Sequence, residues 1–538
     1  MGGLLALLIL GGIVVGVIAM ARRVMEKRGG GPSDGGNVIV YLLLALSVGV
    51  AAFALAELGR AAFPGDSFVS DTSQRVATSL AGLVVATPIA VFLWRREAKR
   101  RLDHPRSAGW TVYLSLIEAV FMTALVIAGY SILNWLLSDG RQPDWTDVLV
   151  FGGVVAFHEI ATRRTPPQSD GSDLPRIVGS AIGLITTAIG LGGILYWLLQ
   201  TLYSTLAATA GGPEIGTWLA VFLVGTPVWL FRWWQPWPDE AGAPRHAWTF
   251  LVAVAGLSTA IGALAGIVLQ ALDYLFADTS PAGEHFEFLP AALSIGIVAG
   301  LAWAHHRRRL GPDRTDPVRA YEYSMAAIGL GSAVGGATAL MAMAFGPSDL
   351  VTPDADVVIT VSTILLFALG VWLWFWSKAS KAPRETEAGT TPRRFYLVGF
   401  AVVTGLVTAG ALIGTLVVLF QRVLGSGGDD TLVIQASLFI FAGLATWHLL
   451  RANAQDRDLI ASDEVVTPFN VTIVCSHPGL IATSFPKEAK LAVMYRDDDA
   501  GVIDELMASE IVEEVGHASS LVWVDEDGFR VAPSRSQT

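Results

Sequence analysis

The chain has 538 residues, of which 53% are hydrophobic and 15% are charged, and its formal net charge is −11. A soluble domain is about 25% charged, so this composition excludes an ordinary water-soluble globular protein. A single cysteine, Cys475, excludes an intrachain disulfide and any cysteine cluster for zinc or iron–sulfur, and the sequence has no basic patch suited to a nucleic acid.

Thirteen apolar segments follow one another along the chain, and we interpret each as a membrane-spanning helix, because apolar runs of roughly 18 residues cross a bilayer. Segment 3–21 is interpreted as a span and not as a cleaved signal peptide, since its basic cluster follows the apolar run. Segment 145–162 is the weakest, because it is short and carries His158 and Glu159. The segments are 3–21, 38–58, 76–94, 110–137, 145–162, 177–203, 215–232, 248–276, 287–305, 321–345, 357–377, 395–424 and 431–450.

Lysine and arginine are distributed unevenly between the predicted loops. The loops after the odd-numbered spans hold 27 of the 36 basic residues, the other loops hold 4 and the C-terminal tail holds 5. Cytoplasmic loops of membrane proteins carry the excess of Lys and Arg. We therefore expect a multi-pass protein of the bacterial inner membrane, in contact with the lipid bilayer, with its N-terminus outside and its C-terminus in the cytoplasm.

The spans show signs of internal repetition. The stretches GLAWAHHRRRLGPDR (300–314) and GLATWHLLRANAQDR (443–457) agree at seven of fifteen positions without a gap. A fixed period of this kind is typical of a tandem architecture. We predict a leading helix with a basic linker (1–36), a membrane domain (37–464) and a cytoplasmic α/β domain (465–538). Within the membrane domain the predicted two-helix repeats are 37–107, 108–173, 174–244, 245–318, 319–392 and 393–464.

The repeats also share short motifs. Later units begin with Arg and an aromatic residue, as in RHAWTF (245–250) and RRFYLV (393–398), continue with Gly-Leu and end with Trp, His and basic residues. These features resemble the bacterial integral membrane family described as domain of unknown function 5671. The resemblance is best in 245–318 and 393–464, fair in 319–392 and weaker in the first three units. It implies an architecture of tandem two-helix repeats and brings no activity, so no catalytic residue is carried over.

Small residues four apart recur in these helices. In a bilayer such pairs allow two helix backbones to approach closely, which is how membrane helices associate. We interpret the recurrent pairs as helix-packing positions. The pairs that occur at matching places in three of the last four units are Gly262 and Gly266, Gly331 and Gly335, and Gly410 and Gly414.

Aromatic, histidine and basic residues gather where helices are expected to leave the bilayer. Trp prefers the headgroup layer, and Arg extends its guanidinium into it. His305 and His306 are adjacent on a helix and point about 100° apart, which disfavours a shared metal ion, so we predict no metal site. The predicted interfacial lipid contacts are Trp303, His305, His306, Arg308, Trp447, His448 and Arg451.

Glu118 is the deepest carboxylate in the predicted spans. An ionisable residue in the hydrocarbon is costly and is by default a functional candidate. Two interpretations stay open: Glu118 binds a proton or a cation, or it caps an internal helix contact. The sequence offers it no obvious buried basic partner.

The C-terminal tail differs in kind from the spans. From Asp463 onward it has 14 acidic and 5 basic side chains, a balance of −9. The stretches NVTIVCS and KLAVMYR predict strands, AGVIDELMASEIVEEVG predicts an amphipathic helix, and SSLVWVDEDGFRVAP predicts a hairpin that turns at Asp527 and Gly528. Cys475, His477 and Lys487 could suggest nucleophilic chemistry, but Cys475 ends an apolar strand, where cysteine is usually a small buried hydrophobe.

Taken together, the sequence predicts an all-α polytopic membrane bundle with a small α/β cytoplasmic domain. We expect a scaffold, sensor or accessory subunit that docks a protein partner through residues 465–538. The alternative is a small-solute or ion transporter or channel that uses Glu118. We identify no catalytic residues and no cofactor, so an enzyme is not the favoured interpretation.

Overall fold

The computed structural model describes residues 32–63, 72–103, 108–138, 142–164, 173–207, 214–234, 243–276, 280–345, 355–424, 431–463, 470–475, 485, 489–495, 503, 505–516, 520–525 and 528–533. Long helices dominate these residues, because backbone N–H and C=O groups inside a bilayer must bond within their own segment. The long helices are α2 (Pro32–Ala62), α3 (Thr72–Asp103), α4 (Ala108–Leu137), α5 (Trp145–Arg164), α6 (Leu174–Ala207), α7 (Ile215–Trp233), α8 (Ala243–Phe276), α10 (Leu289–Arg309), α11 (Asp316–Phe345), α12 (Ala355–Ser380), α15 (Phe400–Val423) and α16 (Leu432–Asp463).

Short helical elements join some of the long helices. The element α9 (Ala282–His285) and the 3-10 turn η1 (Phe286–Phe288) lead into α10. After α12 come α13 (Arg384–Glu387), α14 (Thr391–Arg394) and the π-helical turn η2 (Phe395–Gly399), which continues into α15.

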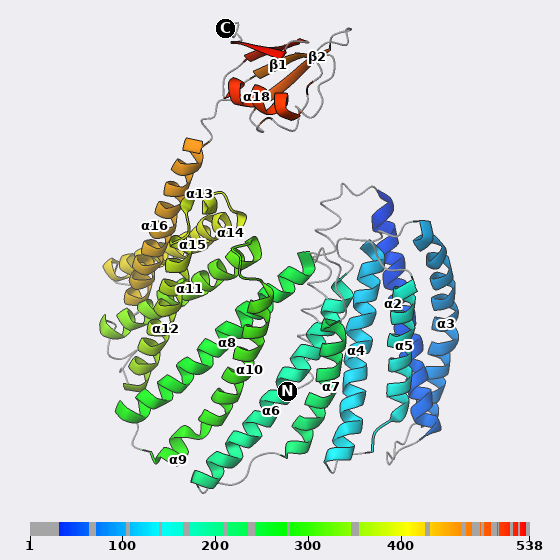
Figure 1. The fold of residues 1–538 in the computed structure, drawn as a ribbon. Coiled ribbons are helices and arrows are strands. Elements are labelled where there is room, and N and C mark those ends of the chain that lie inside the picture. The colour runs from blue at the N-terminus through cyan, green and yellow to red at the C-terminus, as the bar shows by residue number, and fades with distance from the viewer. Residues whose placement is uncertain are drawn as a thin grey trace. The chain divides into compact units, whose positions relative to one another are not determined.

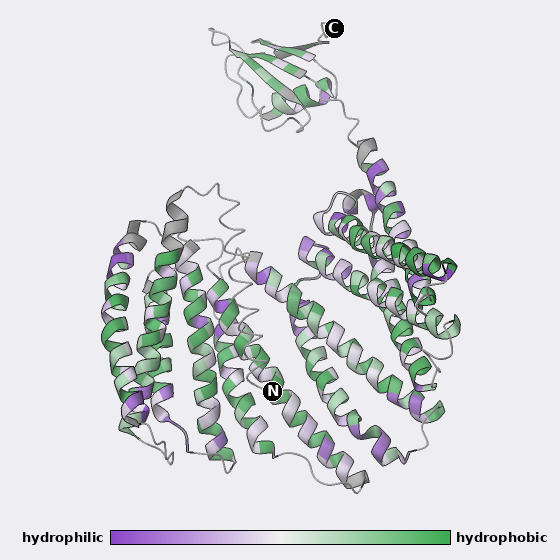
Figure 2. Cartoon of the chain, turned by 180° about the vertical axis from the view of Figure 1, so that it is seen from behind, coloured by the Kyte–Doolittle hydropathy of each residue, from purple (hydrophilic) through white to green (hydrophobic). Residues whose placement is uncertain are grey.

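Eleven helices in the described part of the chain are long and apolar enough to cross a membrane. This confirms the predicted polytopic helical bundle, although the sequence predicted about thirteen spans. The helix α5 is not among the eleven, because its 20 residues include Asp147, His158 and Glu159. The predicted span 3–21 lies outside the described residues. Figure 2 shows the apolar residues spread along the helices and the polar ones concentrated towards their ends.

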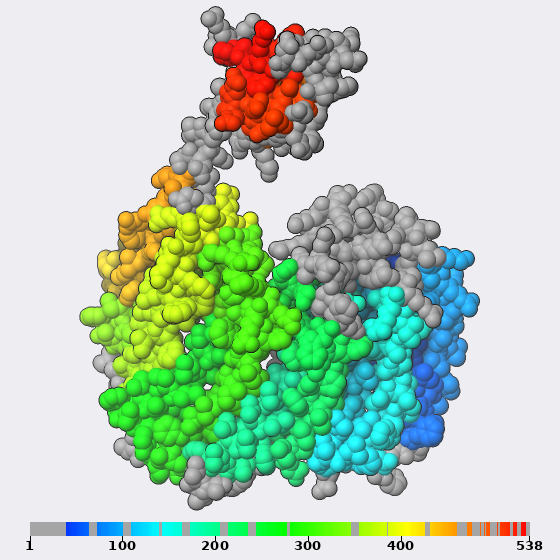
Figure 3. All heavy atoms as spheres, in the orientation of Figure 1, coloured from blue at the N-terminus to red at the C-terminus, as the bar shows by residue number. Residues whose placement is uncertain are grey.

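Contacts divide the chain into two compact units, one of residues 1–379 and 406–443 and one of residues 380–405 and 444–538. In the first unit, consecutive helices pack as antiparallel pairs, α2 with α3, α4 with α5, α6 with α7 and α8 with α10 (Figure 1). Neighbouring pairs do not follow one another in chain order: α6 packs against α10 on one side, and α7 packs against α4 on the other (Figure 1). The space-filling view shows the same part of the chain as a continuous surface (Figure 3). The pairing agrees with two-helix units, and the repetition itself stays a prediction.

The α6–α7 pair is the most closely packed of these. A Cβ atom added at Gly183 would lie 2.4 Å from the backbone nitrogen of Trp229, and one at Gly190 would lie 2.3 Å from that of Phe222. On the other helix, a Cβ at Gly225 would lie 2.5 Å from the nitrogen of Thr187. Glycine is therefore required at these positions. Because the two backbones are in contact there, the position of α7 along the axis of α6 is fixed.

The second unit ends in the α/β domain. Its strands are β1 (Asn470–Cys475), β2 (Lys490–Tyr495), β3 (Ser520–Asp525) and β4 (Gly528–Pro533), and α18 (Glu505–Val515) lies between β2 and β3 in sequence. The predicted strands, helix and hairpin are confirmed, but Gly528, predicted in the turn, begins β4 and pairs with Asp525. The sheet order is β2-β1-β3-β4, with β1 parallel to both β2 and β3, and β4 antiparallel to β3.

One face of this sheet packs on α18 and forms a separate hydrophobic core. Alternate residues of β1, including Val471 and Ile473, meet Val522 of β3 and Ile511 of α18, all with 0% exposure. Because successive side chains of a strand point to opposite faces, the intervening residues form the second face of the sheet. The domain therefore has one buried face and one face that α18 does not cover.

Candidate functional site

Glu118 is part of a buried ion cluster formed by α4, α5 and α7. Both of its carboxylate oxygens contact Arg232: Nε lies 2.7 Å from Oε1, and Nη2 donates a hydrogen bond of 2.8 Å to Oε2. Arg232 also donates from Nη1 to Oε2 of Glu159 at 2.5 Å. Arg232 is 3% exposed and Glu118 is 8% exposed, so this arrangement, which we call the triad, is inside the protein.

Local sequence explains how three helices place these groups together. Glu118 lies in the first half of α4, whereas Glu159 and Arg232 lie near the C-terminal ends of α5 and α7, which run antiparallel to α4. The helix α6 makes room for them with Gly179, where an added Cβ would lie 2.1 Å from Glu118 Oε1 and 3.1 Å from Arg232 Nε. Gly179 thus lets the ion pair sit directly against a helix backbone.

The triad holds two carboxylates and one guanidinium, and Arg163 beside it supplies a second positive charge. Glu159 also accepts a hydrogen bond of 2.9 Å from Nε of Arg163, whose side chain is 62% exposed. Two carboxylates and two guanidinium groups therefore neutralise each other. Removal of one partner of a buried ion pair leaves an uncompensated charge and is strongly destabilising. This geometry answers one of the open alternatives, since Glu118 does join an internal helix contact.

A buried histidine lies on the same pair of helices. Tyr113 Oη and His158 Nε2 are 2.6 Å apart, and His158 Nδ1 is 2.8 Å from the carbonyl of Val154. A carbonyl only accepts, so Nδ1–H donates to Val154. The contact with Tyr113 joins α5 to α4. Trp94 of α3 packs on both rings.

Two further buried ion pairs occur elsewhere. Glu322 of α11 is 1% exposed and lies 2.5 Å from Arg314 Nη1 and 2.7 Å from Lys378 Nζ. In the second unit, Arg393 makes two contacts with Asp456, of 2.5 and 3.0 Å. Several charged groups are thus buried in this bundle, and each has a partner of opposite sign.

The residues predicted to contact lipid at the interface divide into two groups. His306 has 0% exposure, bonds the carbonyl of Ala302 at 2.9 Å and packs on Trp233, so its predicted lipid contact is wrong. Trp303 is half-buried, and its Nε1 donates to the hydroxyl of Tyr321 at 2.9 Å. His305 packs between Trp229 and Trp233.

The other predicted interfacial residues lie on the protein surface. Arg308 and Arg451 are exposed, Trp447 is 59% exposed, and the Arg451 guanidinium lies 5.4 Å from the centre of the Trp447 ring. His448 is half-buried. Exposure at these positions agrees with contact to lipid or to headgroups, and the contact itself stays a prediction.

The glycines singled out by recurrence are mostly not those at helix contacts. An added Cβ would meet no described atom within 4 Å at Gly262, Gly266, Gly335 or Gly410, so the predicted packing role of these four is not seen. Gly414 lies against Gln435. Gly331 is exposed. The close helix contacts lie instead at Gly183, Gly190, Gly225 and at Gly329, where a Cβ would be 2.6 Å from the nitrogen of Trp372.

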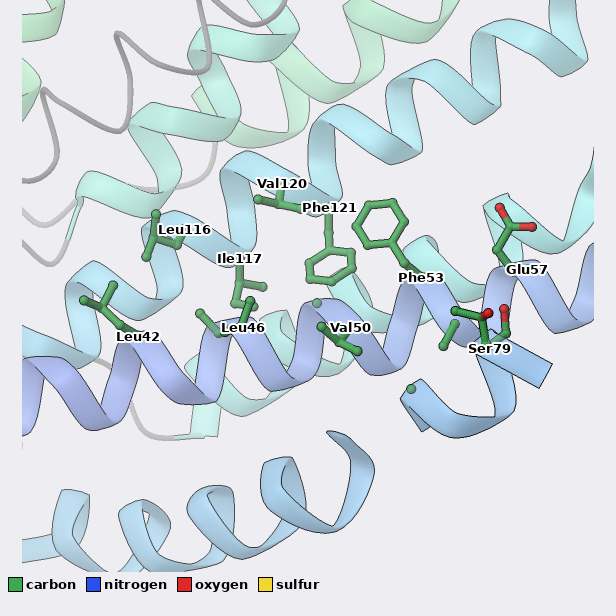
Figure 4. Close-up of a pocket in the computed structure, with 15 residues that line it drawn as sticks. Leu42, Leu46, Val50, Phe53, Glu57, Ser79, Leu116, Ile117, Val120 and Phe121 are labelled. Carbon is green, nitrogen blue, oxygen red and sulfur yellow. The ribbon is translucent and has the colours of Figure 1, made fainter. Parts of the chain in front are cut away.

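Two apolar grooves lie on the bundle. The larger, with a volume of about 680 Å³, lies between α2, α3 and α4 and is shown in Figure 4. The smaller, of about 370 Å³, lies between α8, α11 and α12. Neither groove includes Glu118 in its lining. Among the described residues there is also no cluster of His, Cys, Asp and Glu that could hold a metal ion.

Two regions of the chain match a known family. The family model described as Domain of unknown function (DUF5671) matches residues 37–157 and 319–447. No curated protein and no solved structure matches the chain.

The family match also locates the family's unit within the fold. Each DUF5671 region spans four long helices, α2 to α5 in the first and α11, α12, α15 and α16 in the second. The resemblance predicted from motifs was placed differently, since segment 245–318 lies outside both matched regions and the first two units lie largely inside one. The short Trp–His–basic ending of 300–314 reflects a helix end and was a poor guide to family membership.

Proposed function

We propose that this multi-pass membrane protein is a scaffold or accessory subunit of the bacterial inner membrane, and that its α/β domain docks a protein partner in the cytoplasm. Orientation rests on the basic residues, of which 27 of 36 lie in the loops assigned to one side. The observation that carries the docking role is the sheet face of the α/β domain that α18 does not cover.

That face is continuous and largely apolar. Strand register aligns Met494, Val474, Trp523 and Arg530 in one row across the four strands. Met494 is 59% exposed and Trp523 is 43% exposed, and Leu521 in the neighbouring row is 38% exposed. Exposed aromatic and Met side chains that cluster on one patch are typical of protein interfaces.

The chemistry of the partner follows from the charge of the domain. From Asp463 onward the balance is −9. A domain with a net negative charge attracts a partner segment that carries Lys or Arg beside its apolar residues. We therefore commit to a basic, amphipathic protein segment as the occupant, and we expect its binding to weaken at high salt.

The alternative function, transport through Glu118, has less support. A transport carboxylate must exchange its partner with water or solute during the cycle, whereas both oxygens of Glu118 contact the buried Arg232. Neither of the two grooves described above has Glu118 in its lining. These features favour a structural clamp, by which we mean an ion cluster that holds α4, α5 and α7 together, over a transport site that opens and closes.

The docking role can be tested by photocrosslinking in cells with the full-length protein. A photoreactive amino acid is placed at Leu521, on the exposed sheet face, or at Leu506, which is 72% exposed on α18. We expect a crosslink from position 521, on a partner segment rich in Lys, Arg and apolar residues, and none from position 506. Equal crosslinking at both positions, absence of crosslinking, or crosslinks only to lipid or to a second copy of this chain would overturn the proposal.

A variant of the same face completes the test. Trp523→Asp places a charge on the patch and should remove the crosslink from position 521. Burial raises the pKa of the Cys475 thiol, so alkylation of Cys475 is slow while the domain is folded. Unchanged slow alkylation in the variant shows that the crosslink is lost through the surface and not through unfolding. A crosslink that survives the substitution would contradict the assigned face.

A further inference from the structure

The larger groove combines an apolar channel with a charged end. Its apolar part is lined by Leu42, Leu46, Val50 and Phe53 along α2, and α4 closes the opposite wall (Figure 4). From Leu42 to Phe53 this channel extends about 16 Å, from the helical rise of about 1.5 Å per residue. One leaflet of the hydrocarbon core is about 15 Å thick, so the channel has the length of a lipid tail in one leaflet.

All three helices of the groove are membrane-competent, so the groove opens onto the acyl region of the bilayer. The lining segments lie inside the apolar spans Ile39–Ala62, Ser73–Lys99 and Gly109–Leu137. Leu46 is 64% exposed at the rim, whereas Phe121 of α4 is 1% exposed and closes the inner wall. A lipid tail can therefore enter sideways from the membrane.

The charged end of the groove lies where α2 approaches its C-terminus. Glu57 lines the groove there together with Thr78 and Ser79 of α3. Arg60 lies 2.5 Å from Glu57, and it also bonds Asp147 at 2.6 Å and approaches Asp144 at 3.8 Å. Three carboxylates surround one guanidinium, so the cluster has a surplus negative charge that suits an ammonium group.

The neighbouring α3 offers a charge of the opposite sign. Arg75 precedes Thr78 by three residues and Ser79 by four, which places it on the same face of α3 one turn nearer the helix start. It is exposed and outside the triple-carboxylate cluster. An ammonium beside Glu57 and a phosphate beside Arg75 match the two charges of a zwitterionic headgroup.

We propose that this groove is a specific site for one phospholipid with an amine headgroup, whose tail occupies the channel between α2, α3 and α4. The smaller groove between α8, α11 and α12 provides the contrast, because its lining includes Ser258 and Thr363 but no ionisable residue. Lipid tails can enter it without headgroup selection. The inference is independent of the docking role of the α/β domain.

The test uses the full-length protein in vesicles of phosphatidylethanolamine and phosphatidylglycerol, with a trace of photoreactive phosphatidylethanolamine that carries a diazirine in its tail. We expect labelled peptides from α2 and α4 at the groove. Gly49→Leu fills the channel, since a Cβ at Gly49 meets no described atom within 4 Å. Labelling of these peptides should fall at least fivefold.

Gly153→Leu is the matched control, because Gly153 is also open to added atoms but lies on α5 outside the groove. Its labelling should equal that of the unmodified protein. Leu46→Trp fills the same groove from the rim and serves if Gly49→Leu does not fold. Undiminished labelling in either filling variant that folds, or an equal loss in Gly153→Leu, would overturn the site.

A competition arm tests the headgroup. Excess unlabelled phosphatidylethanolamine should displace the label from the larger groove at least threefold more effectively than phosphatidylglycerol does, and Glu57→Gln should remove that preference. Labelling of peptides from α8 and α11 at the smaller groove should fall equally with either unlabelled lipid. Equal competition by both lipids at the larger groove would overturn the assignment of an amine headgroup.

Discussion

The two regions that match the same family model, residues 37–157 and 319–447, hold their buried carboxylates differently. In the first, Glu118 lies well inside α4, and its partner Arg232 comes from α7, outside the family region. In the second, Glu322 lies near the start of α11 and is bound by Lys378 of the same region and by Arg314 just before it.

The partners also differ in exposure. The Arg232 side chain is 4% exposed, whereas those of Arg314 and Lys378 are 25% and 48% exposed. Water can therefore help to solvate the cations beside Glu322 but not the one beside Glu118. The difference teaches that the two regions each bury a carboxylate, but at a different place in the helix and with partners of different exposure. The triad is a separate feature that ties the first family region to the helices that follow it.

The largest expected effect comes from removal of the cation of the triad. Arg232→Gln leaves Glu118 buried without a counter-charge, and we expect a loss of about 3–5 kcal/mol in the free energy of unfolding. Unfolding in mixed micelles, followed by tryptophan fluorescence, measures this loss. Arg163→Ala is the control, since that side chain is 62% exposed and its loss should cost less than about 1 kcal/mol. Equal losses in the two variants would contradict the clamp.

A smaller loss is expected at the glycine that accommodates the triad. Gly179→Ala places a methyl group 2.1 Å from Glu118 Oε1, so the ion pair must shift, at a cost of about 1–3 kcal/mol. The same unfolding assay applies. Gly153→Ala, which adds a methyl group into open space, should not destabilise the protein. An unchanged free energy of unfolding in Gly179→Ala would mean that the triad is loosely held.

The smallest effect is expected in the second family region. Lys378→Ala removes one partner of Glu322, but Arg314 stays 2.5 Å away and the Lys378 side chain is 48% exposed. We expect a loss of about 0–1 kcal/mol in the free energy of unfolding, as for other solvent-accessible ion pairs. If the loss equals that of Arg232→Gln, the proposed difference between the two regions does not exist.

The sequence predicted the helices well and their partners poorly. Apolar run lengths located the long helices, because the bilayer imposes both length and composition on them. Glu118, which the sequence singled out as the deepest carboxylate of the predicted spans, is 8% exposed. Arg232 was missed because it is 114 residues away and belongs to the stretch VWLFRWWQPW, which is typical of a helix leaving the bilayer. A guanidinium at a helix end that turns inward has the same local sequence as one that extends to the headgroups.

The glycines show the same limit. Recurrence at matching positions selected Gly262 and Gly266, which face open space, whereas the tight contacts occur at Gly183 and Gly190 on α6. Spacing shows that a helix can be approached closely and does not show which neighbour approaches it. In the α/β domain, alternation located the strands, but the parallel pairing of β1 with β2 and β3 depends on long-range connections that no local pattern records.

The most direct test of the account is a double-mutant cycle on Glu118 and Arg232. The unmodified protein, Glu118→Gln, Arg232→Gln and the double variant are unfolded under identical conditions. If the triad is a structural clamp, the double variant is at least as stable as Arg232→Gln, and the coupling between the two sites is about 2–3 kcal/mol. Additive losses with no coupling would show that Glu118 does not act through Arg232 and would contradict the clamp.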